Sequence, residues 1–267
     1  MKTALTIAGS DSSGGAGVQA DLKVFSVLGV YGMTAITAIT AQNTLRVRAV
    51  LTLEPDLVRK QIDTVVGDIQ ADAVKTGMLG NAAVIEAVED CLKRNKLQPY
   101  VCDPVMFAKS GDSLLEKEAV EAMKRKLIPL ATVVTPNLRE VAALTGTDPK
   151  SPLRSVSEAK DAAKRMVDLG AKAAVIKAID AADQTVDLLF DGREFTEFAG
   201  KTQPKEKTHG SGCAYSAAIT AGLATGLTLV AAVDQAKQLV TMAIQYGDGQ
   251  GRGTTPVNVL AFAPKKK

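Results

Sequence analysis

The segment from Thr208 to Cys213 carries residue types that could do demanding chemistry. It reads Thr-His-Gly-Ser-Gly-Cys and stands directly before a long alanine-rich stretch that is expected to be helical. Gly210 and Gly212 would expose backbone amides at the start of that helix, where phosphate or a negatively charged transition state can bind. The helix dipole would lower the pKa of the Cys213 thiol and favour a thiolate acting as base or nucleophile. The alternative is a small core cysteine beside a hydrogen-bonded loop histidine, His209.

A second cluster, at residues 9–17, reads Gly-Ser-Asp-Ser-Ser-Gly-Gly-Ala-Gly and follows a short apolar run. Its missing side chains would let backbone amides approach a ligand, but it lacks the lysine of a P-loop. A relaxed dinucleotide pattern begins at Gly15, yet residues 22–53 contain no Asp or Glu to bind a ribose. A nucleotide-reductase function is therefore disfavoured, and a purely structural glycine turn stays open.

Three charged residues complete the candidate chemistry. Asp103 follows an apolar strand and could bind substrate or metal, or cap the turn made by Pro104. Glu140 could help hold Mg²⁺ through water beside a nucleotide, or form a capping box with Asn137. Lys177 is expected to end a strand, where it could meet phosphate oxygens or be an ordinary solvated lysine.

Strands and helices alternate along the chain and must position these residues. Apolar runs predict strands at residues 5–8, 33–41, 49–51, 73–74, 100–102, 132–134, 173–176, 186–190 and 194–198. Helical spacing and caps predict helices at residues 16–28, 55–66, 82–92, 117–127, 155–170, 212–225 and 229–246. Strands that are apolar throughout indicate a mostly parallel sheet with helices on both faces. Ligands of such sheets bind outside the carboxyl ends of the strands, where the candidate residues fall.

The composition limits the classes of function. Of the 267 residues, 46% are hydrophobic and 23% are charged, as in soluble globular proteins, and no linker divides residues 1–267. We therefore expect one domain, with residues 264–267 as a flexible tail. The net charge of +3 and the aromatic content of 4% argue against nucleic-acid binding, and no apolar run is long enough to span a membrane. Three cysteines without a CxxC pair predict a reducing, cytoplasmic location.

Six ordered segments resemble the hydroxymethylpyrimidine/phosphomethylpyrimidine kinases of thiamine biosynthesis, in the ribokinase-like superfamily. The segments are residues 9–17, Ala-Gln-Asn-Thr at 41–44, Lys-Thr-Gly-Met at 75–78, Asp-Pro-Val-Met at 103–106, Thr-Pro-Asn-Leu-Arg-Glu at 135–140 and residues 208–213. The resemblance covers nearly the whole chain. It implies a three-layer α/β/α sandwich, a homodimer, and use of ATP and Mg²⁺. The implied reaction transfers the ATP γ-phosphoryl group to 4-amino-5-hydroxymethyl-2-methylpyrimidine and then to its monophosphate.

The resemblance also implies a role for each matched residue. Cys213 would take the hydroxyl proton, and an anion hole would be formed by the amides of Gly210, Ser211 and Gly212. Asp103 and Glu140 would organise magnesium and the triphosphate, with Lys177 and Thr208 at the nucleotide. The pyrimidine pocket would use Gly9, Ala16, Asp21, Gln42, Met78 and Val105.

Two departures from the family pattern and two rival functions remain. One departure is the unusually charged segment at residues 203–207, Gln-Pro-Lys-Glu-Lys, before Thr208. After Lys177 the family usually has Gly-Gly-His, whereas this chain has Ala178-Ile179-Asp180, which removes backbone freedom and adds a negative charge near the expected phosphates. Pyridoxal kinases of the same branch share the glycine-rich loop and the Gly-x-Gly-Cys ending. The departure after Lys177 also allows a non-catalytic regulator that binds a pyrimidine without phosphorylating it.

Overall fold

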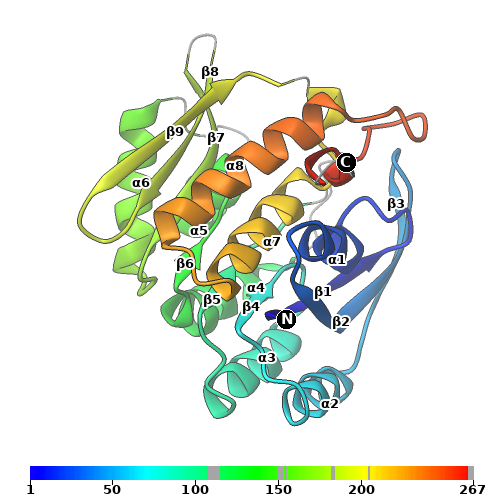
Figure 1. Ribbon diagram of the computed structural model, residues 1–267. Helices are drawn as coiled ribbons and strands as arrows, with labels where there is room; N and C mark the ends of the chain where they lie inside the picture. The colour runs from blue at the N-terminus through cyan, green and yellow to red at the C-terminus, as the bar shows by residue number, and fades with distance from the viewer. Residues whose placement is uncertain (108–114, 149–152, 154, 182–183, 204, 264–267) are drawn as a thin grey trace.

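A mixed β-sheet forms the centre of the computed structural model, which describes residues 1–107, 115–148, 153, 155–181, 184–203 and 205–263 (Figure 1). Within these residues the strands are β1 (Thr3–Asp11), β2 (Tyr31–Gln42), β3 (Val47–Thr52), β4 (Ala73–Thr76), β5 (Tyr100–Cys102), β6 (Val133–Val134), β7 (Ala174–Ala181), β8 (Gln184–Phe190) and β9 (Phe195–Lys201). Their order across the sheet is β3-β2-β1-β4-β5-β6-β7-β8-β9. Strands β2 to β7 in that order pair in parallel, while β3, β8 and β9 are antiparallel at the edges.

Helices cover both faces of the sheet, which makes the predicted three-layer sandwich (Figure 1). One layer contains α2 (Pro55–Val66), α3 (Ala82–Arg94), α4 (Lys117–Ala122), α5 (Leu138–Thr145) and α6 (Val156–Asp168). The other contains α1 (Gly17–Val27), α7 (Ser211–Ala224) and α8 (Leu229–Gln245). Short helices at Met123–Leu127, Ile128–Leu130, Lys205–Lys207 and Val259–Phe262 complete the elements. Each layer buries its own apolar cluster against the sheet, because a two-sided parallel sheet needs both faces covered.

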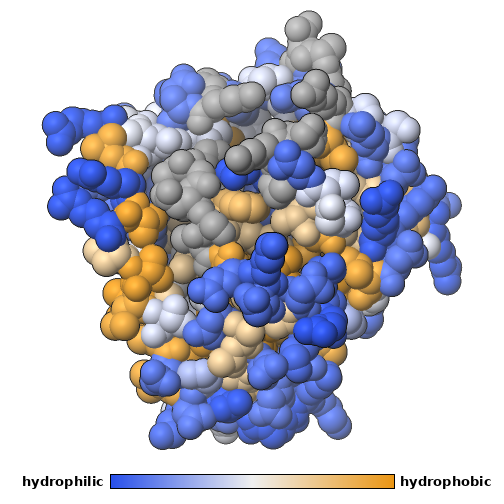
Figure 2. Space-filling view, turned by 180° about the vertical axis from the view of Figure 1, so that it is seen from behind, coloured by the Kyte–Doolittle hydropathy of each residue, from blue (hydrophilic) through white to orange (hydrophobic). Residues whose placement is uncertain are grey.

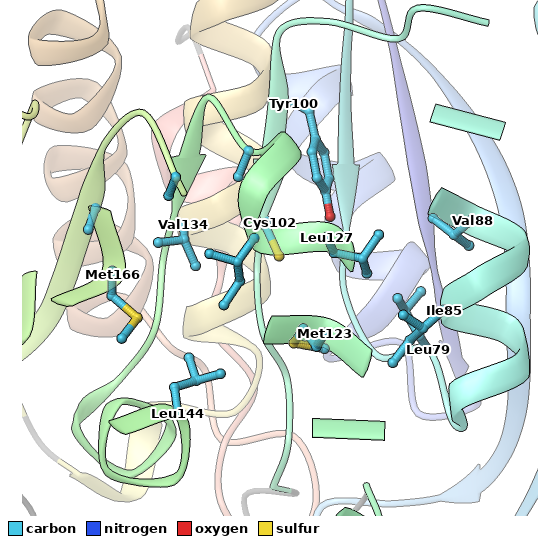
Figure 3. Close-up of a cluster of buried hydrophobic side chains, with 14 of the residues drawn as sticks. Leu79, Ile85, Val88, Tyr100, Cys102, Met123, Leu127, Val134, Leu144 and Met166 are labelled. Atoms are coloured by element: carbon cyan, nitrogen blue, oxygen red, sulfur yellow. The ribbon is translucent and has the colours of Figure 1, made fainter. Parts of the chain in front are cut away.

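The larger apolar cluster lies between the sheet and the α2–α6 layer (Figure 3). Tyr100 and Cys102 from β5 meet Met123 and Leu127 there, and all four are almost fully buried. The Tyr100 hydroxyl lies 2.7 Å from Thr76 Oγ1, so its polar end is satisfied inside the core. This packing fixes the central strands whose carboxyl ends carry the candidate residues.

Helix α7 is buried on nearly all sides, with residues 214–222 at or near zero exposure. It packs beneath α1 and α8 in the second layer. Its alanine-rich sequence allows this close packing, because small side chains let neighbouring helices approach. A helix buried in this way holds its amino terminus, at Ser211, rigidly over the sheet.

The predicted fold class and order of elements are confirmed, with differences at strand ends. The sequence predicted that strand β7 ends at Ile176. In the structure β7 continues to Ala181, with a β-bulge between Ile176 and Ile179. The extra residue puts Ile176 and Ile179, three positions apart, in the same apolar cluster, which interrupts the period of two that predicts a strand. The predicted tail at 264–267 lies outside the described residues. None of the helices in the described part of the chain is long and apolar enough to cross a membrane.

Candidate active site

A cavity of about 730 Å³ lies over the carboxyl ends of the parallel strands. Its wall includes thirteen of the fourteen candidate residues: Gly9, Ala16, Gln42, Met78, Asp103, Val105, Glu140, Lys177, Thr208, Gly210, Ser211, Gly212 and Cys213. Asp21 is the exception. Residues spread over more than 200 positions therefore converge on one concave surface, as expected for an open α/β sheet.

The start of α7 is shaped by the close approach of two glycine-rich segments. Gly210 is the N-cap residue, with φ of +78°, and a Cβ there would collide with the backbone oxygen of Gly15. Gly17 has φ of +58°, and a Cβ there would collide with the oxygen of Gly9. Only glycine fits such positions. The result brings the amino end of α7, with its partial positive charge, against the first loop.

Cys213 lies in the first turn of α7, on the cavity wall and partly buried. Burial raises the pKa of its thiol to about 12, and Asp21 and Asp103 add to the rise. The Lys75 ammonium and the Gly17 amide act in the opposite direction but are outweighed. Burial, which favours the neutral thiol, therefore opposes the thiolate that the helix dipole was expected to favour.

Asp103, Lys177 and Glu140 form a charged cluster on the cavity wall. Lys177 Nζ lies 3.1 Å from Asp103 Oδ1, and Ser216 Oγ donates to Asp103 Oδ2 at 2.9 Å. Burial opposes the charged form of Lys177, but the two carboxylates outweigh it and raise its pKa. Lys177 therefore stays a cation. Its Nζ would lie 3.6 Å from a Cβ on Gly212, which places the positive charge beside the amides of α7.

Glu140 caps helix α5 and also lines the cavity. Asn137 accepts from the amide of Glu140 at 3.0 Å, and Glu140 Oε2 accepts from the amide of Asn137 at 2.8 Å, so the capping box exists. The same carboxyl group is 3% exposed and lines the cavity. Burial raises its pKa to about 7, with Lys177 opposing and Asp103 adding to the rise. Glu140 is thus a cap that also presents a perturbed carboxyl group to the cavity.

Asp21 does not line the cavity. It is fully buried on α1, where its Oδ1 lies 2.8 Å from Lys75 Nζ and its Oδ2 accepts from Thr6 Oγ1 at 2.6 Å. The expectation that Asp21 forms part of the pyrimidine pocket does not fit this placement. Helical spacing alone could not place it, because the inward face of α1 meets both the core and the cavity edge. Asp21 and Lys75 form a buried ion pair that acts on Cys213 electrostatically.

The pair Asp11 and His209 was not singled out from the sequence as functional. His209 Nε2 lies 2.9 Å from Asp11 Oδ2, and both side chains are almost fully buried. Asp11 also accepts from the amides of Ser13 and Ala16, so it organises the whole first loop. The interpretation of His209 as a hydrogen-bonded loop residue is confirmed. Its partner could not be found from the sequence, because the two residues are 198 positions apart.

One side of the cavity is lined by the apolar side chain of Met78, just after β4, and by the side-chain amide of Gln42 at the end of β2. Gly9 leaves room for Met78, whose Sδ would lie 3.4 Å from a Cβ at position 9. Gln42 ends β2, and its Oε1 lies 3.3 Å from Thr40 Oγ1. A side-chain amide offers one acceptor and two donors, which suits a flat heteroaromatic edge.

Asp103 and Glu140 are the acidic candidates for holding a metal ion on the cavity wall. The described residues hold no ready-made group of three His, Cys, Asp or Glu side chains. Both oxygens of Asp103 already accept hydrogen bonds from protein groups. Magnesium in nucleotide enzymes is held by one or two carboxylates together with phosphates and water, and Asp103 and Glu140 fit that pattern.

The mostly parallel sandwich with an open helix terminus over the strand ends is a ribokinase-like fold. The phosphomethylpyrimidine kinase family model matches residues 11–258 of the chain. The hydroxymethylpyrimidine/phosphomethylpyrimidine kinase of Bacillus subtilis is 44% identical over 261 residues, covering 97% of this chain and 95% of that protein. The chain belongs to the phosphomethylpyrimidine kinase family, as the sequence motifs indicated.

Solved structures include members of both rival activities. A phosphomethylpyrimidine kinase from Clostridium difficile 630 is 41% identical with a TM-score of 0.80, covering 91% of this chain and all of that one. The pyridoxal kinase from Staphylococcus aureus in complex with AMP-PCP and pyridoxal is 39% identical with a TM-score of 0.89, covering 98% of this chain and 94% of that one. Overall fold therefore does not separate the pyrimidine from pyridoxal.

Proposed function

We propose that this chain transfers the γ-phosphoryl group of ATP to 4-amino-5-hydroxymethyl-2-methylpyrimidine and then to the resulting monophosphate. The observation that carries the proposal is the convergence of six motifs on one cavity, with Cys213 at one end and the cluster of Asp103, Glu140 and Lys177 beside it. The named family supports the same activity.

Phosphoryl transfer needs positioning and charge stabilisation more than covalent chemistry. The amides of Gly210, Ser211 and Gly212 at the buried start of α7 would receive the oxygens of the transferred group. Lys177 supplies a fixed positive charge next to them, held by Asp103 at 3.1 Å. Thr208 lies on the cavity wall just before this helix and would contact the nucleotide.

Cys213 is proposed as the group that takes the proton from the substrate hydroxyl, and it can do so only as a thiolate, after its own proton has passed to solvent. Its sulfur is a neutral thiol at physiological pH, since burial raises the pKa of this group to about 12. A base of this kind is strong when ionised but seldom ionised. Lys75 lowers the pKa of Cys213 and would favour the thiolate when it forms.

Magnesium would be held by Asp103 and Glu140, directly or through water, together with the nucleotide phosphates. When bound it would neutralise charge on the transferred group. Glu140, with its pKa near 7, presents a carboxyl group that changes charge in the physiological range.

The pyrimidine would bind among Gly9, Ala16, Gln42, Met78 and Val105. Gln42 can pair with both a ring nitrogen and the exocyclic amine, whereas pyridoxal carries a phenolic oxygen in place of that amine pattern. The amide of Gln42 on the cavity wall therefore favours the pyrimidine.

The proposal is tested by steady-state assays of the pyrimidine, its monophosphate and pyridoxal with ATP and magnesium. We expect the highest kcat/KM for the pyrimidine or its monophosphate. A higher kcat/KM for pyridoxal would assign the chain to the rival kinase. Calorimetric binding of the pyrimidine without product at saturating ATP would instead indicate a non-catalytic binding protein.

We also propose one catalytic domain, a homodimer and a cytoplasmic location. The single sheet runs from Thr3 to Lys201, which supports one domain. Ile39, Val50 and Leu51 are 49%, 43% and 64% exposed near the β3 edge, and hydrophobic atoms are visible on that side of the molecule (Figure 2). An open edge strand with apolar side chains suits pairing with a second copy. The three free cysteines suit a reducing compartment.

A further inference from the structure

The β-bulge in β7 gives the backbone next to Lys177 an unusual conformation. Ile176 pairs with Leu188 and Ile179 with Val186, so two residues of β7, at 177 and 178, face the single residue Asp187 of β8. Ala178 has φ of +59°, in the left-handed region that favours glycine. A bulge of this kind re-aims the side chain beside it.

Asp187 binds the bulge with one carboxylate oxygen and Lys237 of α8 with the other. The amide of Ala178 donates to Asp187 Oδ1 at 2.8 Å, and Lys237 Nζ lies 3.1 Å from Oδ2. Lys237 also donates to the carbonyl oxygen of Thr185 at 3.1 Å, which fixes α8 to β8. Asp187 is 4% exposed, so these contacts are shielded from water. The carboxylate therefore connects α8, β8 and the strained turn of β7.

Lys177 lies next to this turn and is bonded through both its amide and its ammonium group. The amide of Lys177 donates to the Pro136 oxygen at 3.2 Å, and its Nζ reaches Asp103 at 3.1 Å. A regular strand has successive side chains on opposite faces, so removing the extra bulge residue would shift the register of everything beyond Ile176. Lys177 would then lose its aim at the amides of α7.

We propose that Asp187 is a positioning residue for phosphoryl transfer, holding Ala178 in the left-handed conformation so that Lys177 faces the transferred phosphate. The inference rests on the proposed kinase function of the cavity. Family members with glycine after this lysine, as the resemblance implies, would need such a clamp less. In this chain Ala178 disfavours the left-handed conformation, so the hydrogen bond to Asp187 is needed to hold the backbone next to Lys177 in place.

The decisive experiment compares Asp187→Ala with the double variant Asp187→Ala/Ala178→Gly. Misplacing a reacting group by about 1 Å can cost on the order of 100-fold in rate. We expect Asp187→Ala to raise KM for ATP and to lower kcat, so that kcat/KM for ATP falls roughly 10- to 100-fold. KM for the pyrimidine should be unchanged. Glycine at position 178 adopts the left-handed conformation without a clamp, so the double variant should recover most of the loss.

Two controls separate positioning from simple stability. Asp187→Asn keeps an oxygen for the Ala178 amide and should lose less ATP affinity than Asp187→Ala, which also serves if the alanine variant fails to fold. Ala199→Gly places glycine on the exposed part of the neighbouring β9, where no left-handed residue stands. We expect Ala178→Gly to raise the melting temperature and Ala199→Gly to lower it.

Calorimetric binding of AMP-PCP reports on the nucleotide site without turnover. Weakened AMP-PCP binding in Asp187→Ala, restored by Ala178→Gly, supports the inference even if the proposed substrate is wrong. Unchanged AMP-PCP affinity with only a lower melting temperature would overturn it, as would a double variant no better than Asp187→Ala. Failure of the wild-type protein to phosphorylate any substrate would instead contradict the proposed function.

Discussion

Alkylation of Cys213 tests the electrostatics of the site directly. Iodoacetamide reacts with the thiolate, so the rate follows the ionised fraction and access to the sulfur. With a pKa of about 12, the ionised fraction of Cys213 at pH 8 is roughly 1 in 10,000, whereas a thiol at the ordinary 9.0 is roughly 1 in 10 ionised. We therefore expect Cys213 to react about 1,000-fold more slowly than a free cysteine at pH 8.

Mass spectrometry of tryptic peptides after timed alkylation measures each cysteine separately. Cys91 and Cys102 have no exposed surface, so they serve as internal controls and should react more slowly still in the folded protein. The Cys213 rate should rise about tenfold for each pH unit up to pH 10, without a plateau. A plateau near pH 7 at a rate like that of a free cysteine would refute the burial argument and restore a dipole-stabilised thiolate.

Three further variants test separate parts of the site. Glu140→Gln should lower magnesium-dependent turnover. The melting temperature of the wild-type protein should fall as pH rises from about 4.5 to about 7, because the raised pKa stabilises the fold only while Glu140 is protonated. The Gln variant does not titrate at this position, so its melting temperature should fall less over the same pH range. Melting curves at several pH values beside magnesium titrations check both results, and equal loss of turnover and stability would leave only the capping role. Gln42→Leu should raise KM for the pyrimidine, at about 1 to 3 kcal/mol per unpaired polar group, and an unchanged KM would remove Gln42 from the pocket. His209→Ala should leave Asp11 buried with one partner fewer and lower the melting temperature by several degrees, whereas an unchanged melting curve would show that this link carries no stability.

The sequence predicted the fold because strand runs and helix caps are local signals. The capping box at Ser155, with Glu158 three residues later, is present as predicted and begins α6. The hairpin around Gly192 forms between β8 and β9, with φ of +93° at that glycine. The convergence of most candidate residues on one cavity followed from the rule for parallel sheets.

What the sequence did not predict depends on contacts between distant segments. Asp21 is fully buried and forms an ion pair with Lys75, which lies 54 positions later in the sequence. The pKa of Cys213 depends on burial among other elements, and motif spacing carries no information on that. The bulge at Ala178 required the Asp187 carboxylate from the next strand.

The central claim is that this cavity phosphorylates a hydroxymethylpyrimidine in two successive steps. Time-resolved mass spectrometry of the pyrimidine incubated with ATP, magnesium and the protein measures it directly. The account predicts the monophosphate first and the diphosphate after it, with both steps slowed about 100- to 10,000-fold in Cys213→Ala while the melting temperature changes little. Absence of both phosphorylated products from the wild-type protein, or near-normal rates in Cys213→Ala, would contradict it.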